Sequence, residues 1–402
     1  MRAALRATVL APRDLFRDDF MGDLSRWVKT DTENKISLAG GNLLFAGGKA
    51  APAWGDPVMA VNQIIQRQAG VCLEVDVADI AATNTDFWVG FCTDTAPGDI
   101  TGSDTQPAIS FRATAVITPA VGASAVDVAA YAAATPYRLR VILGSYDVAN
   151  KVVSPNGFMV FIQGGAFGTL GSGSWVLLWR DTGGSTASLY HAISNNTADI
   201  DFGYARVYRH PFPMPVVYDS FNRADGVMGN ADSGRAWISQ EASPGIASNK
   251  AKATTNAVTE CVAESRTANG LIQETVNVGT PGGTGLGAGP LVRDVDTDNF
   301  LWAYIYVNGV GGGSFNLAKI IAGVSTGLGA WGMPAENTDY AMAVLANDTS
   351  LRVYVDGVQR ISATDAAHQT ATKHGWRTSS AGGSGDKTQP THDNFLVQGG
   401  LA

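Results

Sequence analysis

Residues 289–309 read GPLVRDVDTDNFLWAYIYVNG, and this stretch decides the fold class of the chain. A short apolar run, Leu291-Val292, leads into a turn rich in Asp and Asn. A longer apolar run follows and closes on Asn308-Gly309, which is a strong hairpin signal. Two apolar runs joined and ended by turn residues predict a β-meander and argue against a helix.

The longer run, residues 300–307, has two apolar faces, because side chains alternate with period two along a strand. One face carries Phe300, Trp302, Tyr304 and Tyr306, and the other carries Leu301, Ala303, Ile305 and Val307. A strand that is apolar on both faces is predicted to be central in its sheet and largely covered.

The order of these signals resembles the laminin-G and concanavalin A-like jelly-roll superfamily. The shared features are a Gly, an aliphatic pair, an Arg, an acidic turn, then an Asn-aromatic step and an apolar strand. The resemblance implies a sandwich of two antiparallel sheets. Period-two strands separated by Gly, Asn, Asp and Ser turns elsewhere in the chain predict the same architecture.

Length and composition suit two such domains. The chain has 402 residues, enough for two domains of about 190 residues that each bury a core. Glycine is abundant, with 47 residues, and charged residues make up only 16%. This profile is typical of an all-β protein with many loops. Cys72, Cys92 and Cys261 are too few and too scattered for a disulfide framework, so we expect them to pack as small apolar residues.

The formal net charge of −8 argues against a nucleic-acid partner and an anionic membrane partner, which both require a basic face. No apolar run reaches the roughly 18 residues that span a bilayer. The first ten residues lack the uninterrupted apolar core of a secretory signal. We therefore expect the chain to fold in a cytoplasm.

The same order of signals occurs twice, which predicts two copies of one domain. Asp19-Phe20 followed by Trp27 is echoed by residues 219–221 followed by Trp237, and the closing run 200–207 is echoed by 392–397. The expected first and last strands of each copy lie at these two ends, so we expect them to pair.

The predicted organisation has four parts. Residues 1–16 form an N-terminal arm, 17–208 the first jelly roll, 209–216 a linker and 217–402 the second jelly roll. The linker holds alternating prolines, which stiffen the chain and remove ladder hydrogen bonds. The predicted fold is therefore two tandem antiparallel concanavalin-like sandwiches.

The second copy opens with DSFNRADG at residues 219–226, which resembles the opening of concanavalin-like domains in structural proteins of tailed bacteriophages. The resemblance implies a non-enzymatic virion protein on head or tail that folds in the host cytoplasm. Its implied partners are other virion proteins, further copies of itself on a symmetric particle, and a host-surface glycan. The first copy departs from the pattern, because it lacks the Arg and acidic turn and carries a Gly-rich insertion at 164–184.

Residues 1–16 are either a frayed terminus or a docking arm that adds a strand to a partner sheet. A cellular carbohydrate-binding protein or a remnant glycosidase is the alternative to the virion protein.

Glu74, Asp76 and Asp79 are the most tempting catalytic candidates. They resemble the Glu-x-Asp-x-x-Glu strand of concanavalin-like glycoside hydrolases, whose retaining members use two carboxyl groups about 5 Å apart. Period two places Glu74 and Asp76 on one face, but the third position is the shorter Asp79. We expect a solvated strand face and no catalytic residue.

No cofactor is expected, although related jelly rolls imply a structural calcium. Asp294, Asp296, Asp298 and Asn299 imitate the start of a calcium loop. The sixth position of that loop is Asn299 instead of Gly, and the twelfth is Ile305 instead of a bidentate Glu. A tight hairpin turn explains these residues as well. The five histidines have no metal-site spacing.

The candidate ligand-binding residues are Trp302, Tyr304, Tyr306, Arg352 and Tyr354. If they lay on one concave sheet, their flat rings and guanidinium would suit a sugar ring or a partner chain. The alternative, which the sequence favours, is that the aromatic stripe is the core between the two sheets. One of the two apolar faces must be buried in either case.

Overall fold

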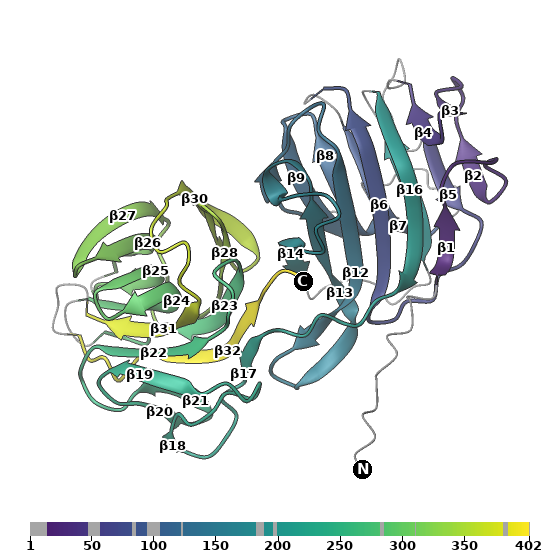
Figure 1. Ribbon diagram of the computed structural model, residues 1–402. Helices are drawn as coiled ribbons and strands as arrows, with labels where there is room; N and C mark the ends of the chain where they lie inside the picture. Colours follow the sequence, from purple (N-terminus) through teal and green to yellow (C-terminus); the bar gives the residue numbers. More distant parts are fainter. Residues whose placement is uncertain are drawn as a thin grey trace, which may run out of the picture. The chain divides into compact units, whose positions relative to one another are not determined.

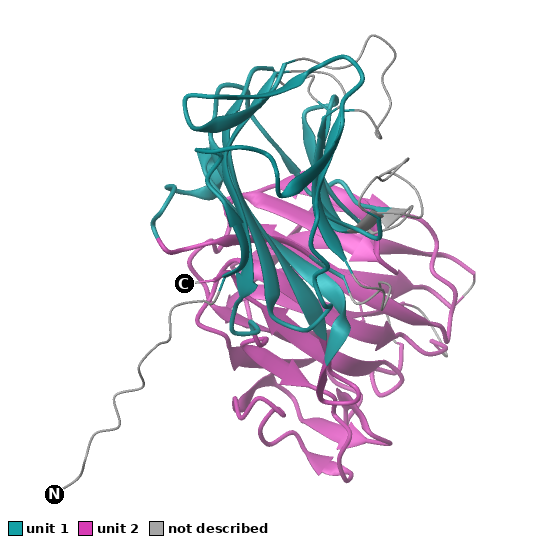
Figure 2. Ribbon diagram, turned by 90° about the vertical axis from the view of Figure 1, so that its right-hand side faces the viewer, with its two compact units in different colours: residues 1–145, 154–172, 180–213 teal, residues 146–153, 173–179, 214–402 magenta. Residues whose placement is uncertain are grey.

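The computed structural model describes residues 14–46, 57–82, 86–94, 105–121, 124–181, 189–195, 199–281, 285–309, 311–380 and 385–401 (Figure 1). The chain divides into two compact units (Figure 2). The first contains residues 1–145, 154–172 and 180–213, and the second contains 146–153, 173–179 and 214–402. The division after Pro213 falls inside the predicted linker.

The strands of the N-terminal half form two antiparallel sheets, named here by a central strand. In order, the β6 sheet contains β14 (Val176–Asp181), β13 (Val152–Gln163), β12 (Tyr137–Asp147), β6 (Val71–Ile80), β16 (Ile200–Arg209), β4 (Asn42–Phe45) and β3 (Ile36–Ala39), with β1 (Asp14–Asp18) also paired to β16. The β7 sheet contains β10 (Ser124–Ala125), β9 (Val116–Val121), β8 (Thr105–Arg112), β7 (Phe87–Cys92), β15 (Tyr190–Asn195), β5 (Val58–Val61) and β2 (Trp27–Thr30), with β11 (Ala129–Ala130) on β9. A short 3-10 helix, η1 (Gly165–Phe167), follows β13.

The C-terminal half repeats this architecture (Figure 1). The β23 sheet contains β18 (Gly226–Val227), β20 (Pro244–Ala247), β21 (Lys250–Ala253), β32 (Thr391–Gln398), β23 (Gly270–Asn277), β28 (Asp339–Asn347), β29 (Ser350–Val355) and β30 (Val358–Thr364), with β17 (Val217–Asp219) on β32. The β25 sheet contains β19 (Trp237–Glu241), β22 (Thr259–Glu264), β31 (Lys373–Ser379), β24 (Leu286–Asp296), β25 (Asn299–Val307), β26 (Gly313–Ile321) and β27 (Val324–Trp331).

Each hydrophobic core lies between the two sheets of its pair. In the second unit, Ile272 and Val344 of the β23 sheet are buried in one cluster with Leu301 and Trp376 of the β25 sheet. In the N-terminal half, side chains from the two sheets meet in the same way, and the ring of Phe202 on β16 lies 5.9 Å from that of Phe87 on β7. The prediction of an all-β fold built from two-sheet antiparallel sandwiches is confirmed.

The first and last strands of each sandwich pair, as the sequence predicted. Strand β1 is antiparallel to β16, and β17 is antiparallel to β32. In the first unit, Asp18 accepts hydrogen bonds from the backbone N–H of Phe20 (2.8 Å) and the indole of Trp27 (2.7 Å). The aspartate of this corner is therefore Asp18, one residue before the Asp19 of the sequence match.

The same corner opens the second unit. Asp219 accepts hydrogen bonds from the backbone N–H of Phe221 (2.9 Å) and from the indole of Trp237 (2.7 Å). Phe20 and Phe221 both adopt positive φ, 54° and 50°. A bulky residue in the left-handed region is rare, so its recurrence at an offset of 201 residues supports two copies of one design.

The expected boundary of the N-terminal arm is wrong. Residues 1–13 lie outside the described part of the chain, but Asp14–Asp18 forms β1 and pairs with β16. Phe16 on this strand is 2% exposed and packs edge-on against Trp27, with ring centroids 5.3 Å apart. The last three residues of the expected arm, 14–16, therefore belong to the first sandwich.

Two smaller expectations concern the cysteines and membrane spans. Cys72, Cys92 and Cys261 are all buried, which confirms that they pack as small side chains in the interior. Across the described ranges, the structure has no helix with the length and hydropathy to cross a bilayer.

Candidate functional site

The aromatic stripe of β25 faces away from the inter-sheet core. Leu301, Ala303 and Ile305 belong to that core, so Phe300, Trp302 and Tyr304 lie on the outer face of the β25 sheet. The expectation that the stripe forms the inter-sheet core is therefore wrong. The outer face has an apolar cluster of its own, in which Phe300 and Trp302 are largely buried and Tyr304 is partly exposed.

Glycines on the neighbouring strand β24 make room for these rings. A Cβ at Gly287 would lie 3.0 Å from the Trp302 ring, and a Cβ at Gly289 would lie 2.1 Å from the Ala303 carbonyl oxygen. The indole of Trp302 donates a hydrogen bond to the Gly289 carbonyl (3.2 Å). Trp302 and Tyr304 stack, with centroids 4.0 Å apart and planes 18° apart. The bare backbone of β24 thus leaves room for this stacked pair of rings, called the aromatic platform below.

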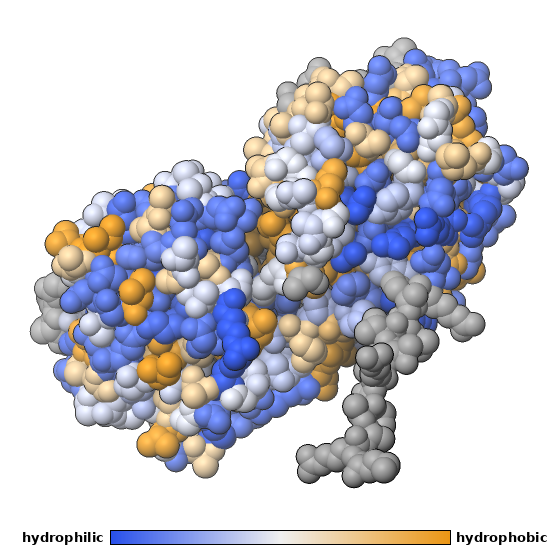
Figure 3. Space-filling view, in the orientation of Figure 1, coloured by the Kyte–Doolittle hydropathy of each residue, from blue (hydrophilic) through white to orange (hydrophobic). Residues whose placement is uncertain are grey.

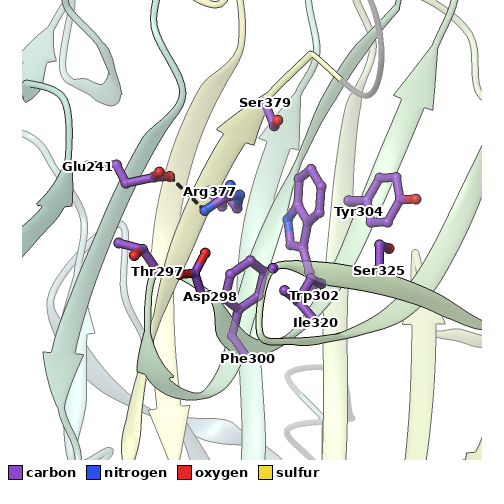
Figure 4. Close-up of a pocket in the computed structure, with 11 residues that line it drawn as sticks. Glu241, Thr297, Asp298, Phe300, Trp302, Tyr304, Ile320, Ser325, Arg377 and Ser379 are labelled. Carbon is purple, nitrogen blue, oxygen red and sulfur yellow. Dashed lines mark hydrogen bonds and ion pairs between the residues drawn. The ribbon is translucent and has the colours of Figure 1, made fainter.

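A hollow of about 270 Å³ opens beside this platform (Figure 4). Phe300, Trp302, Tyr304 and Ile320 supply its apolar lining. Its polar lining comes from Glu241, Thr297, Asp298, Ser325, Arg377 and Ser379. The lining residues are far apart in the sequence. They come from strands β19, β25, β26, β27 and β31 and from the turn between β24 and β25.

Arg377 is the cationic centre of the hollow. Its guanidinium donates to a Glu241 carboxylate oxygen at 2.8 Å and also contacts Glu260. It lies over the Phe300 ring at 4.8 Å and 5.8 Å from the Trp302 ring centroid. The Arg377 side chain is only 13% exposed. Strand register explains this position, because Arg377 pairs with Glu260 on one side and Gly289 on the other.

Two buried carboxyl groups pair with Arg377 and Lys373. Glu260 is fully buried, and burial raises its pKa to about 8, although the positive charge of Arg377 opposes the rise. Asp294 is 1% exposed and bonds to the Lys373 ammonium at 2.9 Å and the Gln240 amide at 2.5 Å. The negative charge of Asp294 also raises the pKa of Glu260.

The acidic turn at the rim is held by hydrogen bonds among its own residues. One Asp296 carboxylate oxygen accepts hydrogen bonds from the Asp298 N–H (2.9 Å) and the Asn299 amide (2.8 Å). Within the described ranges, no group of three His, Cys, Asp or Glu side chains could hold a metal ion. The hydrogen bonds within the tight turn account for these acidic residues. Strand β24 also extends to Asp296, so Asp294 is a strand residue.

The other predicted ligand-binding residues are not brought to this hollow. Tyr306 follows the stripe on β25 but packs toward Gly285, where a Cβ would lie 2.7 Å from its hydroxyl. Arg352 and Tyr354 are on β29, in the β23 sheet. The expectation that all five share one sheet is therefore wrong. Their side chains alternate with Leu351 and Val353 of the core, and Tyr354 is only 1% exposed.

Glu74 and Asp76 share the outer face of the β6 sheet, as period two predicts, but the expectation of a solvated face is wrong for Glu74, which is buried. Glu74 is 1% exposed and accepts hydrogen bonds from Arg140 (2.7 Å), Arg206 (2.7 Å), Tyr204 and Tyr208 (3.0 Å). Burial alone would raise the pKa of Glu74, but Arg140 and the hydrogen bonds hold it below its usual value.

This outer face is a closed network of ion pairs. Asp76 pairs with Arg138 at 3.2 Å, and Asp79 accepts a hydrogen bond from the Ile80 N–H. Hydrophilic residues gather on the face over β6 and β16 (Figure 3). A buried carboxylate with four donors is a poor nucleophile and, because it is held ionised, a poor general acid.

Comparisons with known proteins leave the function of the chain open. No family model matches the sequence, and no curated protein matches it. Among solved structures, the carbohydrate binding module CBM66 from Bacillus subtilis aligns at 15% identity over 40% of this chain and 94% of that one, with a TM-score of 0.33. The Bacillus licheniformis beta-glucanase aligns at 17% identity over 45% and 95%, with a TM-score of 0.29.

A third similar structure is the galectin LEC-6 of Caenorhabditis elegans, at 8% identity over 33% of this chain and 84% of that one, with a TM-score of 0.25. These likenesses are too distant to assign a ligand or an activity.

Sequence reasoning found the aromatic platform but missed its polar partners. Arg377 is not among the candidate residues that the sequence indicates. Period two could have placed it on the outer face, because Trp376 is a core residue. Nothing in the local sequence indicated Glu241 or Glu260, which reach Arg377 through the pairing of β19, β22 and β31.

Proposed function

We propose that this chain is a non-enzymatic, glycan-binding structural protein, and that the hollow on the β25 sheet binds the glycan. One observation carries the proposal: the stacked Trp302–Tyr304 platform beside Arg377 in a hollow ringed by hydroxyl and carboxylate groups. Flat aromatic faces suit the C–H face of a pyranose ring, and the polar rim can exchange hydrogen bonds with its hydroxyls. A hollow of about 270 Å³ suits a small part of a chain, such as one sugar unit.

Catalysis is not part of this proposal. Glu74 is buried and bonded to four donors, and Glu260 is fully buried against Arg377. Neither carboxyl group meets the geometric requirement that a catalytic acid, base or nucleophile reach the substrate. We expect no hydrolysis of any glycan that the protein binds.

The setting we propose is a tailed-bacteriophage virion, on head or tail, with other virion proteins and further copies of this chain as partners. Support comes from the opening at residues 219–226, which resembles phage structural domains. Residues 1–13 precede β1, and we propose that they anchor the protein to its particle. The alternative is a carbohydrate-binding protein of cellular origin. Genes for capsid, portal or tail proteins beside this gene would favour the virion, and polysaccharide-degrading genes the alternative.

The test is a glycan-array screen followed by titration calorimetry with the best oligosaccharide. We expect Tyr304→Ala to weaken binding about tenfold or more, because it removes half of the platform. The matched control is Trp331→Ala, which removes an exposed aromatic residue from the same sheet outside the hollow. Circular dichroism checks that both variants stay folded. If both variants bind like the wild type, the hollow is not the site.

A further inference from the structure

The hollow of the β25 sheet has more carboxylates than cations. Glu241 and Asp298 line it, Glu260 contacts Arg377, and Asp294 bonds to Lys373. The two nearby cations are already engaged. Arg377 bonds to Glu241 and Glu260, and Lys373 bonds to Asp294 at 2.9 Å and to a backbone carbonyl at 2.7 Å.

Among the charged residues that line the hollow, Asp298 is the one without a counter-charge in the described part of the chain. Within the described ranges, its carboxylate oxygens accept no hydrogen bond and form no ion pair, and the residue lines the hollow opposite Tyr304 and Ser325 (Figure 4). Burial raises the pKa of Glu260, which favours the neutral form of this carboxyl group. Even then Arg377 is balanced by Glu241 and Lys373 by Asp294, which leaves the charge of Asp298 unmatched.

Arg377 is not free to receive an anion. Its side chain is only 13% exposed, with the guanidinium shared between two carboxylates and held over the Phe300 ring. A carboxylate or sulfate on a ligand would have to displace Glu241 and would meet Asp298 without a counter-charge. A neutral sugar avoids this repulsion, and its hydroxyls can donate hydrogen bonds to Asp298.

We infer that the hollow selects by charge, taking neutral sugar rings and rejecting acidic ones such as uronates, sialates and sulfated sugars. This inference rests on the proposed glycan binding and adds the class of ligand. Asp298 is the specificity-determining residue, because its carboxylate accepts from a sugar hydroxyl and repels an anionic substituent.

The experiment compares two oligosaccharides of equal length and linkage, one neutral and one built from the matching uronic acid, by titration at low and moderate salt. At low salt the wild type should bind the neutral oligosaccharide at least about fivefold more tightly than the uronate. Added salt should reduce this difference in affinity. Asp298→Asn should shift the affinity ratio toward the uronate by about fivefold. Asp339→Asn makes the same charge change on β28 of the other sheet and should leave the ratio unchanged.

Equal or tighter binding of the uronate by the wild type would overturn the inference while leaving glycan binding intact. An equal shift of the ratio in Asp298→Asn and Asp339→Asn would also overturn it, because the effect would then be one of net charge. If neither oligosaccharide binds and the array is blank, the proposed function itself fails.

Discussion

The outer faces of the β6 sheet and the β25 sheet both carry arginines paired with carboxylates. Arginines outnumber carboxylates in the first network, and carboxylates outnumber arginines in the second. On β6 and its neighbours, Arg138, Arg140 and Arg206 surround two carboxylates, Glu74 and Asp76. On the β25 sheet, Arg377 is shared by two carboxylates, Glu241 and Glu260. The pKa of Glu74 is accordingly lowered, whereas that of Glu260 is raised to about 8.

The difference explains why one face is closed and the other is open. Donors in excess saturate Glu74, and long side chains fold across the strands to reach it. On the β25 sheet, Gly287 and Gly289 carry no side chain, so rings stand on bare backbone and leave a hollow of about 270 Å³ beside them. The outer face of β6, with its two acidic residues, is thus structural. The candidate site is built instead by the apolar strand β25.

The largest effect predicted from this comparison is on stability. Glu74→Ala should lower the free energy of unfolding by about 3 kcal/mol or more, because it leaves Arg140, Arg206 and two tyrosine hydroxyls without their shared acceptor. Denaturant unfolding followed by circular dichroism measures the change. Asp19→Asn, which breaks the exposed Arg17–Asp19 pair, is the control and should cost well under about 1 kcal/mol.

A similar small decrease in the free energy of unfolding in both variants would mean that the Glu74 network is a solvated surface. The contrast between the outer faces of the β6 and β25 sheets would then disappear. Glu74→Ala should also leave glycan binding unchanged.

A smaller effect is expected in the pH dependence of stability. The folded-state pKa of Glu260, about 8, lies above its usual value near 4.5, so the folded chain holds a proton that the unfolded chain releases. The contribution of Glu260 is therefore fully present below about pH 4.5 and is lost as pH rises toward 8. Glu74 has the opposite sign, because its lowered pKa gives stability that is lost as the solution becomes acidic.

Thermal melts from pH 5 to 8.5 test the sign for Glu260. Glu260→Gln should flatten the decline of the melting temperature across this window, since Gln cannot lose a proton. Glu264→Gln changes a carboxyl group on the same strand whose pKa is lowered, and it should not flatten the decline. If the melting temperature of Glu260→Gln falls with pH in parallel with that of the wild type, the raised pKa of Glu260 is contradicted.

Much of the fold could be predicted because it depends on local patterns. Period-two runs and turn residues located the central hairpin, and the echo of Asp-Phe and Trp signals located the two copies. The place of Phe16 in the first sandwich could not be predicted. Nothing in the sequence of residues 1–16 shows that the Phe16 ring packs against Trp27. The site was harder to predict, since β25 is apolar on both faces and period two cannot say which face is the core.

The sheet to which a strand belongs is also not a local property. Arg352 and Tyr354 follow the stripe by about fifty residues, but chain order does not reveal that β29 joins the other sheet. Arg377 and Glu241 are 136 residues apart and meet only through strand pairing.

The central claim is that the β25 hollow, and not the β6 face, binds a glycan. The most direct test is the tryptophan indole region of a ¹H–¹⁵N spectrum during titration with a neutral oligosaccharide, with Trp302 assigned from Trp302→Phe. We predict that the Trp302 signal shifts with ligand, because its ring lines the hollow, while the signal of Trp331 outside the hollow stays in place. A saturable shift at other indoles with Trp302 unmoved would contradict the claim.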